Sequence, residues 1–337
     1  MTNREPDSVK EPSQASDSES RRTVFITVAI CTRNREHFLA AACRSVMEQL
    51  GPAAELLIVD NASTDGTARI AQGLRTQNPR VRVVQESQAG ISHARNRALR
   101  EGLGEYIVFF DDDELAEPGW LLAYIDFFRH PPSAMIGSVG GPCISEYEVP
   151  PPSWLTPTHG GFDLGGERRV LQGVVGPGAG NCGYCRQAVI AVGGFDPALI
   201  RCEDSELNWR LREAGYEVWW LPEARIRHRI PASLFSMRKQ LRTAFMEGRS
   251  VTLFRLRATP RRPERLAFIL ARLTSPALAA LQALAAALCL TVGKRRASFR
   301  VLSRAFRNVG IFTELLLRLV TRSAVGPQLR PPESTRC

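Results

Sequence analysis

From residue 24 onward, the chain alternates short apolar runs with segments in which apolar residues recur every three or four positions. The short runs are rich in β-branched residues, as buried strands are, and the longer segments have the spacing of helices that bury one face. This alternation predicts an α/β fold, with a mainly parallel sheet covered by helices on both faces. The predicted strands are residues 24–31, 55–60, 81–87 and 105–110, and the predicted helices are residues 35–50, 63–77, 91–103 and 120–128.

Residues 131–183 break this pattern, because they are rich in proline and glycine. We expect them to be poor in regular structure and to form loops that shape a substrate pocket. A helix and then a helix–turn–strand unit are predicted again between residues 185 and 228. The chain thus divides into a disordered tail at 1–22, an α/β domain at 23–230 and a helical region at 231–337.

An acidic run stands where a buried strand ends. The apolar residues 106–110 are followed directly by Asp111, Asp112 and Asp113. Ligands of such sheets bind beyond the carboxyl ends of the strands, and a D-x-D pair suits Mg²⁺ or Mn²⁺, which can bridge a diphosphate. The alternative is a solvated acidic turn in which Asp113 caps the next helix. Other polar strand ends are Thr32 to Asn34 and Asp60 with Asn61, for which strand termination and helix capping are the alternatives.

A second acidic pair, Glu203 and Asp204, precedes an amphipathic helical segment. A carboxylate at a helix N-terminus is stabilised by the helix dipole, so a capping role is one interpretation. The other is a general base that faces the ligand edge of the sheet.

Four stretches in order resemble the inverting nucleotide-sugar glycosyltransferases of family 2, which have the GT-A fold. The stretches are residues 28–49 (VAICTRNREHFLAAACRSVMEQ), 56–67 (LLIVDNASTDGT), 89–120 (AGISHARNRALREGLGEYIVFFDDDELAEPGW) and 193–228 (GGFDPALIRCEDSELNWRLREAGYEVWWLPEARIRH). The resemblance implies a GT-A catalytic domain at 23–230, with a basic helical extension after it.

The resemblance also implies roles for individual residues. Asp204 matches the catalytic base, and Glu203 beside it is the second catalytic candidate. Metal binding, by Mg²⁺ or Mn²⁺, is implied for Asp111, Asp113 and His228. Binding of the nucleotide and sugar is implied for Thr32, Asn34, Arg35, Asp60, Asn61, Arg95, Asp111 and Asp112. Trp154 is a candidate for stacking on a sugar face, with ordinary loop packing as the alternative; for His228 the alternative is a structural histidine, and for Arg95 a solvated helix face or a salt bridge.

The function that the resemblance implies is transfer of a single sugar, with inversion, from a nucleotide-diphosphate sugar to a glycan hydroxyl. A UDP-sugar is the expected donor, and a lipid-linked or polysaccharide glycan is the expected acceptor. The Q-x-x-R-W motif of processive synthases is missing. A non-catalytic nucleotide-sugar-binding or membrane scaffold protein of the same fold is the alternative. Neither G-x-G-x-x-G after the first strand nor a P-loop is present, which disfavours dehydrogenases and P-loop enzymes.

The charge is strongly divided along the chain. Of the net +10, residues 231–337 carry +16 (20 Lys+Arg, 4 Asp+Glu) and residues 1–230 carry −6 (24 Lys+Arg, 30 Asp+Glu). Residues 273–293 hold no charge and are flanked by Arg272 and Lys294, so a spanning, interfacial or buried helix is compatible with them. We expect attachment to an anionic membrane, at the cytoplasmic face of the cell membrane. The alternative is a helical subdomain that packs on the catalytic domain and has a solvated basic face. Nucleic-acid binding is not expected, because no aromatic interleaving or known motif is present.

Eight cysteines are too few for a disulfide scaffold in a chain of 337 residues. Cys182 and Cys185 form a C-x-x-C pair with no second pair, so we predict neither a zinc site nor an oxidising compartment.

Overall fold

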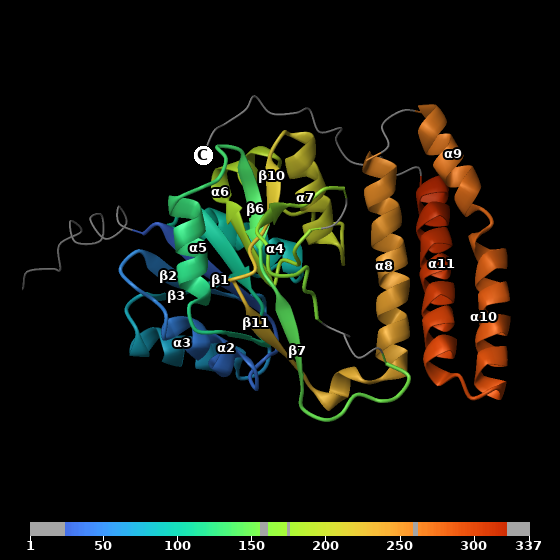
Figure 1. Ribbon diagram of the computed structural model, residues 1–337, viewed down its shortest axis with the longest axis horizontal. Coiled ribbons are helices and arrows are strands. Elements are labelled where there is room, and N and C mark those ends of the chain that lie inside the picture. Colours follow the sequence, from blue (N-terminus) through green and yellow to red (C-terminus); the bar gives the residue numbers. More distant parts are fainter. Residues whose placement is uncertain (1–23, 156–160, 174–175, 259–261, 322–337) are drawn as a thin grey trace, which may run out of the picture.

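The computed structural model describes residues 24–155, 161–173, 176–258 and 262–321. The predicted tail at 1–22 lies outside them. A central sheet of eight strands has the order β3-β2-β1-β4-β9-β6-β10-β8 (Figure 1). Its first four strands are parallel to one another, as predicted. They are β1 (Ile26–Thr32), β2 (Ala54–Asp60), β3 (Val81–Gln85) and β4 (Tyr106–Phe110).

The predicted helices of this half are present and pack on the sheet. Their bounds are α2 (Leu39–Met47), α3 (Thr67–Gln77), α4 (Ile91–Glu101) and α5 (Trp120–Arg129). Helices α2 and α3 contact each other and β2, while α4 lies against β1 and β2. Every residue of β2 and β4 is buried. The strands therefore form the centre of the core, and their polar ends are held in place at one edge.

The prediction of loops throughout residues 131–183 is wrong. This segment contains β6 (Ile136–Gly140), β7 (Cys143–Tyr147), β8 (Arg169–Val170) and β9 (Asn181–Cys185). Strand β9 runs antiparallel between β4 and β6, so it extends the sheet beyond the acidic run. Glycines fit here because the backbone is crowded: a Cβ on Gly141 would collide with the carbonyl oxygen of Ala224.

A second, three-stranded sheet has the order β5-β11-β7. Its strands β5 (Glu114–Ala116) and β11 (Ile226–Ile230) pair antiparallel, and β11 pairs parallel with β7. Because β5 follows the acidic run directly, this pairing brings β11 beside that run. The remaining elements of the α/β part are α6 (Arg186–Ala191), α7 (Glu203–Glu213) and β10 (Glu217–Trp220).

The C-terminal part is helical, as predicted, and lies to one side of the α/β part (Figure 1). After a 3-10 turn at Ala232–Leu234, the helices are α8 (Met237–Ala258), α9 (Arg262–Arg272), α10 (Ser275–Thr291) and α11 (Arg295–Thr321). Helix α11 packs between α8 and α10. The α8–α11 crossing is so close that a Cβ on Gly248 would meet the backbone of Arg307, and one on Gly310 would meet the backbone of Phe245.

Helix α8 joins the helical part to the α/β part through several contacts. The rings of Trp209 in α7 and Phe254 in α8 meet edge to face, 5.4 Å apart. Arg257 of α8 forms an ion pair with Asp196. The backbone N–H of Arg201 donates a hydrogen bond to the Ser250 hydroxyl at 3.2 Å. The helices are therefore packed on the segment that leads into α7.

Candidate active site

The acidic run forms a turn between β4 and β5, and most of it is buried. Asp112 is 6 % exposed and Asp113 is 9 % exposed. Glu114 is also buried, and its carboxylate accepts a hydrogen bond from the backbone N–H of Asp111. The side chain of Asp111 is 44 % exposed, so it is the most accessible carboxylate of the turn. Buried carboxylates at such density require positive charge nearby.

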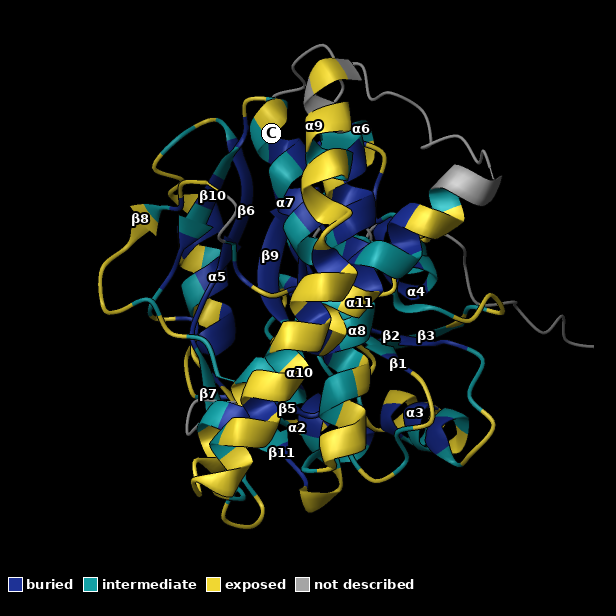
Figure 2. Cartoon of the chain, turned by 90° about the vertical axis from the view of Figure 1, so that its right-hand side faces the viewer, coloured by how far each residue is buried: buried dark blue, intermediate teal, exposed yellow. Residues whose placement is uncertain are grey.

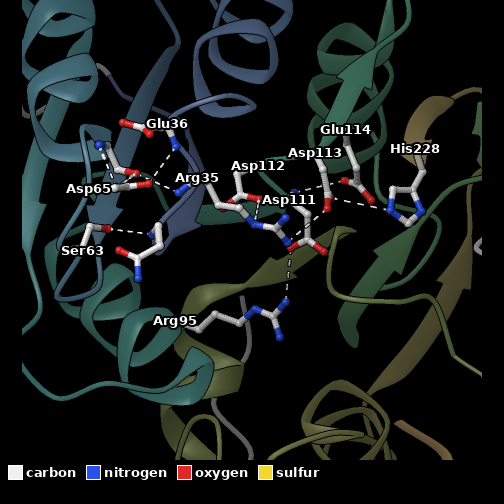
Figure 3. Close-up of polar contacts among 12 residues, drawn as sticks. Arg35, Glu36, Ser63, Asp65, Arg95, Asp111, Asp112, Asp113, Glu114 and His228 are labelled. Atoms are coloured by element: carbon white, nitrogen blue, oxygen red, sulfur yellow. Dashed lines mark hydrogen bonds and ion pairs between the residues drawn. The ribbon is translucent and has the colours of Figure 1, made fainter. Parts of the chain in front are cut away.

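Arg35 supplies part of that charge from the loop after β1. Its guanidinium lies 3.2 Å from the Asp112 carboxylate and 3.3 Å from the Asp113 carboxylate (Figure 3). The Arg35 side chain is itself 38 % exposed, so water partly screens these pairs. The turn is therefore only partly neutralised from this side.

Arg95 approaches the turn from α4. It is 5 % exposed, and its guanidinium lies 2.5 Å from Glu203 and 3.5 Å from Asp111. The aromatic rings of Phe109 and Phe195 pack against the same guanidinium. Burial raises the pKa of Glu203, and the charge of Arg95 opposes this rise. Arg95 thus connects the acidic turn with the start of α7.

Three carboxylates of the turn have raised pKa values, so each binds a proton more readily than it would in water. Burial raises the pKa of Asp112 to about 7; Arg35 opposes that rise, and the charge of Asp113 adds to it. Burial also raises the pKa of Asp113, with His228 opposing. For Glu114, burial and the charge of Asp111 raise the pKa well above its usual range. The turn therefore carries unfavourable negative charge that a cation would relieve.

His228 reaches the turn because of strand register. It lies opposite Glu114 in the β11–β5 pair, and the backbone N–H of Arg229 donates to the carbonyl of Asp113 at 2.9 Å. The His228 Nε2 atom then lies 3.7 Å from the Asp113 carboxylate. The resemblance placed this histidine near the acidic run, and the small sheet is the physical reason that it arrives there.

The three residues predicted to bind a metal do not form one compact cluster. Asp113 and His228 face each other, whereas Asp111 pairs with Arg95 (Figure 3). Among the described residues, no group of three His, Cys, Asp or Glu side chains is arranged as a metal site. The donor chemistry nevertheless fits a hard divalent cation, because carboxylates with raised pKa values and an imidazole meet at one turn.

Asp204 stands at the start of α7, beyond the same edge of the sheet. One carboxylate oxygen accepts hydrogen bonds from the backbone N–H and the hydroxyl of Ser205, at 2.6 and 3.2 Å. The other accepts from the backbone N–H of Ala179 at 3.2 Å. The residue Cys202, just before α7, has a left-handed φ of 61°. Such backbone is strained for a residue with a side chain and is typical of functional turns.

A cavity of about 750 Å³ unites these groups. It brings together Asp111–Asp113, Arg35, Arg95, Glu203, Asp204 and His228. The positive and negative groups line one space of a size that suits a nucleotide and a sugar. Of the polar strand ends noted in the sequence, the acidic run lines this cavity with all three of its aspartates.

Asp60 and Asn61 were predicted to bind substrate but do not line this cavity. Asp60, 1 % exposed, accepts hydrogen bonds from the Gln85 side chain and the Ser63 backbone. Asn61 is tied to the carbonyls of Glu86 and Gln88 and to the N–H of Gly90. Both side chains hold the loops after β2 and β3 in place.

Thr32 and Asn34 were also predicted to bind substrate and also do not line the cavity. Thr32 is 2 % exposed at the end of β1, and its hydroxyl favours the charged form of Asp112. Asn34 has a φ of 54°, and its side-chain oxygen accepts a hydrogen bond from the backbone N–H of Thr64.

Trp154 does not reach the cavity either. Its ring packs against Phe299 of α11, with 4.5 Å between the ring centroids. It is absent from the residues that line the cavity. Of the two interpretations of Trp154, the structure therefore has the packing one, with a partner from the C-terminal helices.

The cavity also contains residues that the sequence did not single out. Arg33 and Arg201 add positive charge to its wall, and Glu247 enters it from α8. The Glu247 carboxylate lies 2.9 Å from the guanidinium of Arg307 in α11. Arg33 stands within the conspicuous stretch after β1, whereas no local signal distinguishes Glu247 from a solvated helical glutamate.

Comparison with known proteins identifies the family. Residues 27–193, the part of the chain that contains the sheet and the acidic turn, match the model described as Glycosyl transferase family 2. The chain belongs to glycosyl transferase family 2. The resemblance found in the sequence is thereby confirmed, and the protein is a glycosyltransferase.

The relatives of this glycosyltransferase include a glucuronosyltransferase and a succinoglycan biosynthesis protein. It is 23 % identical over 222 residues to the glucosyl-dolichyl phosphate glucuronosyltransferase of Haloferax volcanii, covering 61 % of this chain and 69 % of that protein. It is 26 % identical over 307 residues to the succinoglycan biosynthesis protein ExoM of Rhizobium meliloti, covering 87 % of this chain and 94 % of that protein.

A solved structure shares the fold of the glycosyltransferase. It is the mannosyltransferase PcManGT from Pyrobaculum calidifontis in complex with GDP-Man and Mn²⁺, with a TM-score of 0.55 and 19 % identity. The match covers 84 % of this chain and 86 % of that one. The predicted GT-A fold is therefore confirmed.

Proposed function

We propose that this glycosyltransferase moves a single sugar, with inversion, from a nucleotide-diphosphate sugar to a hydroxyl of a lipid-linked or polysaccharide glycan. The supporting observation is one cavity in which the acidic turn Asp111–Asp113, Arg95 and Asp204 converge. Phosphate oxygens need positive charge or a cation, and an acceptor hydroxyl needs a base. The cavity offers both.

Asp204 acts as the general base. Its carboxylate is oriented by the N–H groups of Ser205 and Ala179 and lies on the cavity wall. It takes the proton of the acceptor hydroxyl while that oxygen forms a bond to the anomeric carbon. The bond from the anomeric carbon to the diphosphate oxygen breaks, and its electron pair leaves with the nucleotide diphosphate. A single displacement from the opposite face inverts the anomeric configuration.

Asp113 and His228 would hold a divalent cation, Mg²⁺ or Mn²⁺, with Asp111 on the same turn. When bound, the cation supplies Lewis-acid stabilisation of the charge that develops on the departing diphosphate. The structural relative solved with GDP-Man and Mn²⁺ supports this assignment. Arg35 holds the side chains of Asp112 and Asp113 at the edge of the cavity through an ion pair with each carboxylate.

Glu203 and Arg95 act as a positioning pair. Arg95 is held by Glu203 at 2.5 Å and faces Asp111 across the cavity wall. Its guanidinium is available to the phosphate side of a donor, because it is oriented but not exposed to bulk water. Glu203 was predicted beside the base, and its engagement with Arg95 leaves the proton transfer to Asp204.

A UDP-sugar is the first donor to test, with GDP-mannose as the alternative that the relative from Pyrobaculum calidifontis suggests. The relatives from Haloferax volcanii and Rhizobium meliloti support a lipid-linked or polysaccharide acceptor. Such acceptors are assembled at membranes, so we assign the protein to the cytoplasmic face of the cell membrane.

The deciding experiment compares Asp204→Asn with Glu213→Gln, an exposed carboxylate on the same helix. Release of nucleotide diphosphate is followed with a panel of UDP-, GDP- and dTDP-sugars, Mn²⁺ and a lipid extract as acceptor. We expect Asp204→Asn to lower turnover by about 10²- to 10⁴-fold and Glu213→Gln to leave it unchanged.

Binding of the donor is measured separately, by thermal shift, and should survive in Asp204→Asn. Undiminished turnover in Asp204→Asn would refute the assignment of the base. Donor binding with no turnover in the unaltered protein, on any donor of the panel, would favour a non-catalytic binding protein.

A further inference from the structure

Helix α10 turns its large apolar residues outward and its small residues toward the protein. A helix of a water-soluble protein has the reverse arrangement. Leu281, Leu284 and Leu288 follow helical spacing along one side and are 64, 70 and 66 % exposed. On the other side, Ala279 and Ala286 are buried. In a water-soluble bundle, large apolar side chains face inward, so this arrangement leaves the most hydrophobic side of α10 without a protein partner among the described residues.

The inner side of α10 is fixed to α11 by small and polar groups. Gln282 accepts a hydrogen bond from Asn308 at 2.9 Å, and the Ser298 hydroxyl donates to the carbonyl of Ala286 at 2.8 Å. Both bonds would have to break if α10 turned its leucines inward. The outward face is therefore a built feature of the helical part, and close packing through small residues is typical of helices next to lipid.

Exposed leucines also occur on α9, the helix that precedes α10 in the chain. Leu266 and Leu270 of α9 are 56 and 54 % exposed. In the view of Figure 2, α9 and α10 face the reader and are largely exposed, on the side of the molecule remote from the central sheet. We call this surface, made of Leu266, Leu270, Leu281, Leu284 and Leu288, the leucine face.

Positive charge lies at both ends of α10. Arg272 is exposed where α9 ends, and Lys294, Arg295 and Arg300 are exposed beyond the end of α10. No Asp or Glu occurs between residues 265 and 313. An uncharged strip with basic rims complements the acyl boundary and the anionic headgroups of a bilayer. A second copy of the same face would instead bring basic rims together.

Length and packing argue for a helix that lies in the plane of the membrane. The stretch of residues 266–291 is long and apolar enough to cross a membrane by length and composition. The stretch is divided between α9 and α10, and the 17 residues of α10 span only about 26 Å, less than a hydrocarbon core of about 30 Å. One side of α10 is also occupied by α11.

We propose that the leucine face docks flat on an anionic lipid bilayer, with its leucines at the acyl boundary and its basic rims among the headgroups. This inference does not depend on the transfer reaction. It rests on the outward leucines, the fixed inner side of α10 and the charge at both ends.

The test uses the full-length protein and preformed vesicles of phosphatidylcholine, with or without phosphatidylglycerol, in a flotation assay. We expect binding that requires phosphatidylglycerol. The triple variant Leu281→Gln/Leu284→Gln/Leu288→Gln should bind at least about tenfold more weakly. The triple variant Lys294→Gln/Arg295→Gln/Arg300→Gln should lose roughly a hundredfold on anionic vesicles and little on neutral ones.

The matched control is Leu122→Gln/Ile190→Gln, which alters exposed apolar residues of α5 and α6 away from the leucine face. It should bind vesicles like the unaltered protein, and circular dichroism should show that all variants are folded. Unchanged flotation of the leucine variant would overturn the proposal. A dimer that forms without lipid and that the leucine variant dissociates would also overturn it. Membrane association only when vesicles are formed around the protein would indicate a spanning helix and would overturn it too.

Discussion

Arg95 lies between two carboxylates that come from distant parts of the chain, Asp111 after β4 and Glu203 at the start of α7. Because Arg95 and Glu203 are both buried, removing the charge of Arg95 would leave Glu203 buried and unpaired. The loss of one partner of a buried pair is far more costly than the loss of an exposed one.

We therefore expect Arg95→Met to lower the free energy of unfolding by about 3–5 kcal/mol. Arg100→Met is the control, because Arg100 is on the same helix, is 61 % exposed and pairs with Glu86 at 3.6 Å. It should cost at most about 1 kcal/mol. Urea denaturation measures both. Adding Glu203→Gln to Arg95→Met should recover part of the loss, and equal losses in the two single variants would contradict a buried pair.

The raised pKa of Asp112 predicts a pH dependence of stability. Its pKa moves from 3.8 to about 7 on folding, so the folded state binds more protons between these values. Stability from this group is present below pH 4 and is lost as the pH rises toward and through 7. Without metal, the melting temperature should fall between pH 5.5 and 8. Asp112→Asn should reduce that fall, whereas Asp126→Asn, at an exposed site on α5, should not.

Metal binding should have the opposite pH dependence. A cation must displace protons from carboxylates whose pKa values are raised, so binding strengthens as the pH rises. At one Mn²⁺ concentration, the increase in melting temperature should be larger at pH 8 than at pH 6. A shift of equal size at both pH values would show that Mn²⁺ binds elsewhere.

The part of the site that lies at the ends of strands could be predicted from the sequence. The acidic run after an apolar strand placed Asp111–Asp113 at the ligand edge, and the helix start placed Asp204 near it. The same rule included Asp60 and Asn61, which end a strand but bind neighbouring loops. Local pattern does not separate a polar group that holds a loop from one that faces a cavity, because both need the same side chains.

Among the elements, the parallel half of the sheet followed from the pattern, and β6, β7 and β9 did not. Strand β9 reads NCGYC and β6 reads IGSVG, so glycine and small polar residues replace the expected apolar run. These strands are buried because the backbone itself is tightly packed: a Cβ on Gly183 would lie only 3.0 Å from the Tyr124 ring. A sequence pattern records side-chain hydrophobicity and carries no signal for backbone that is buried in this way.

The α8–α11 crossing gives a prediction for whole elements. A methyl group on Gly248 or Gly310 has no room, because backbone of the facing helix lies where the Cβ would be. Gly248→Ala should therefore separate the helices and destabilise the protein by about 1–3 kcal/mol. Gly73→Ala is the control: it is inside α3 with nothing within 4 Å, and alanine should stabilise it by about 0.5–1 kcal/mol. Thermal denaturation compares them, and a neutral Gly248→Ala would refute the close crossing.

Over the whole molecule, the helical part and the α/β part share the active-site wall. Glu247 of α8 lines the cavity, and Ser250 of α8 binds the backbone of Arg201, next to the left-handed Cys202. A chain that ends at residue 236 should therefore lose most transfer activity even with a water-soluble acceptor and without lipid. Release of nucleotide diphosphate, compared with the full chain, measures this. Full activity of the shortened chain would mean that α8 only attaches the protein to its surroundings.

This sharing of the Cys202 turn limits how the protein can be recombined with others. Grafting the helices of another transferase after residue 230 would have to reproduce a hydroxyl at position 250 and a carboxylate at position 247. A chimera without them would lose the contacts that hold the turn before α7, where the proposed base Asp204 lies. Exchanging the helical part therefore also exchanges a wall of the cavity, because that wall includes a residue of the 22-residue helix α8.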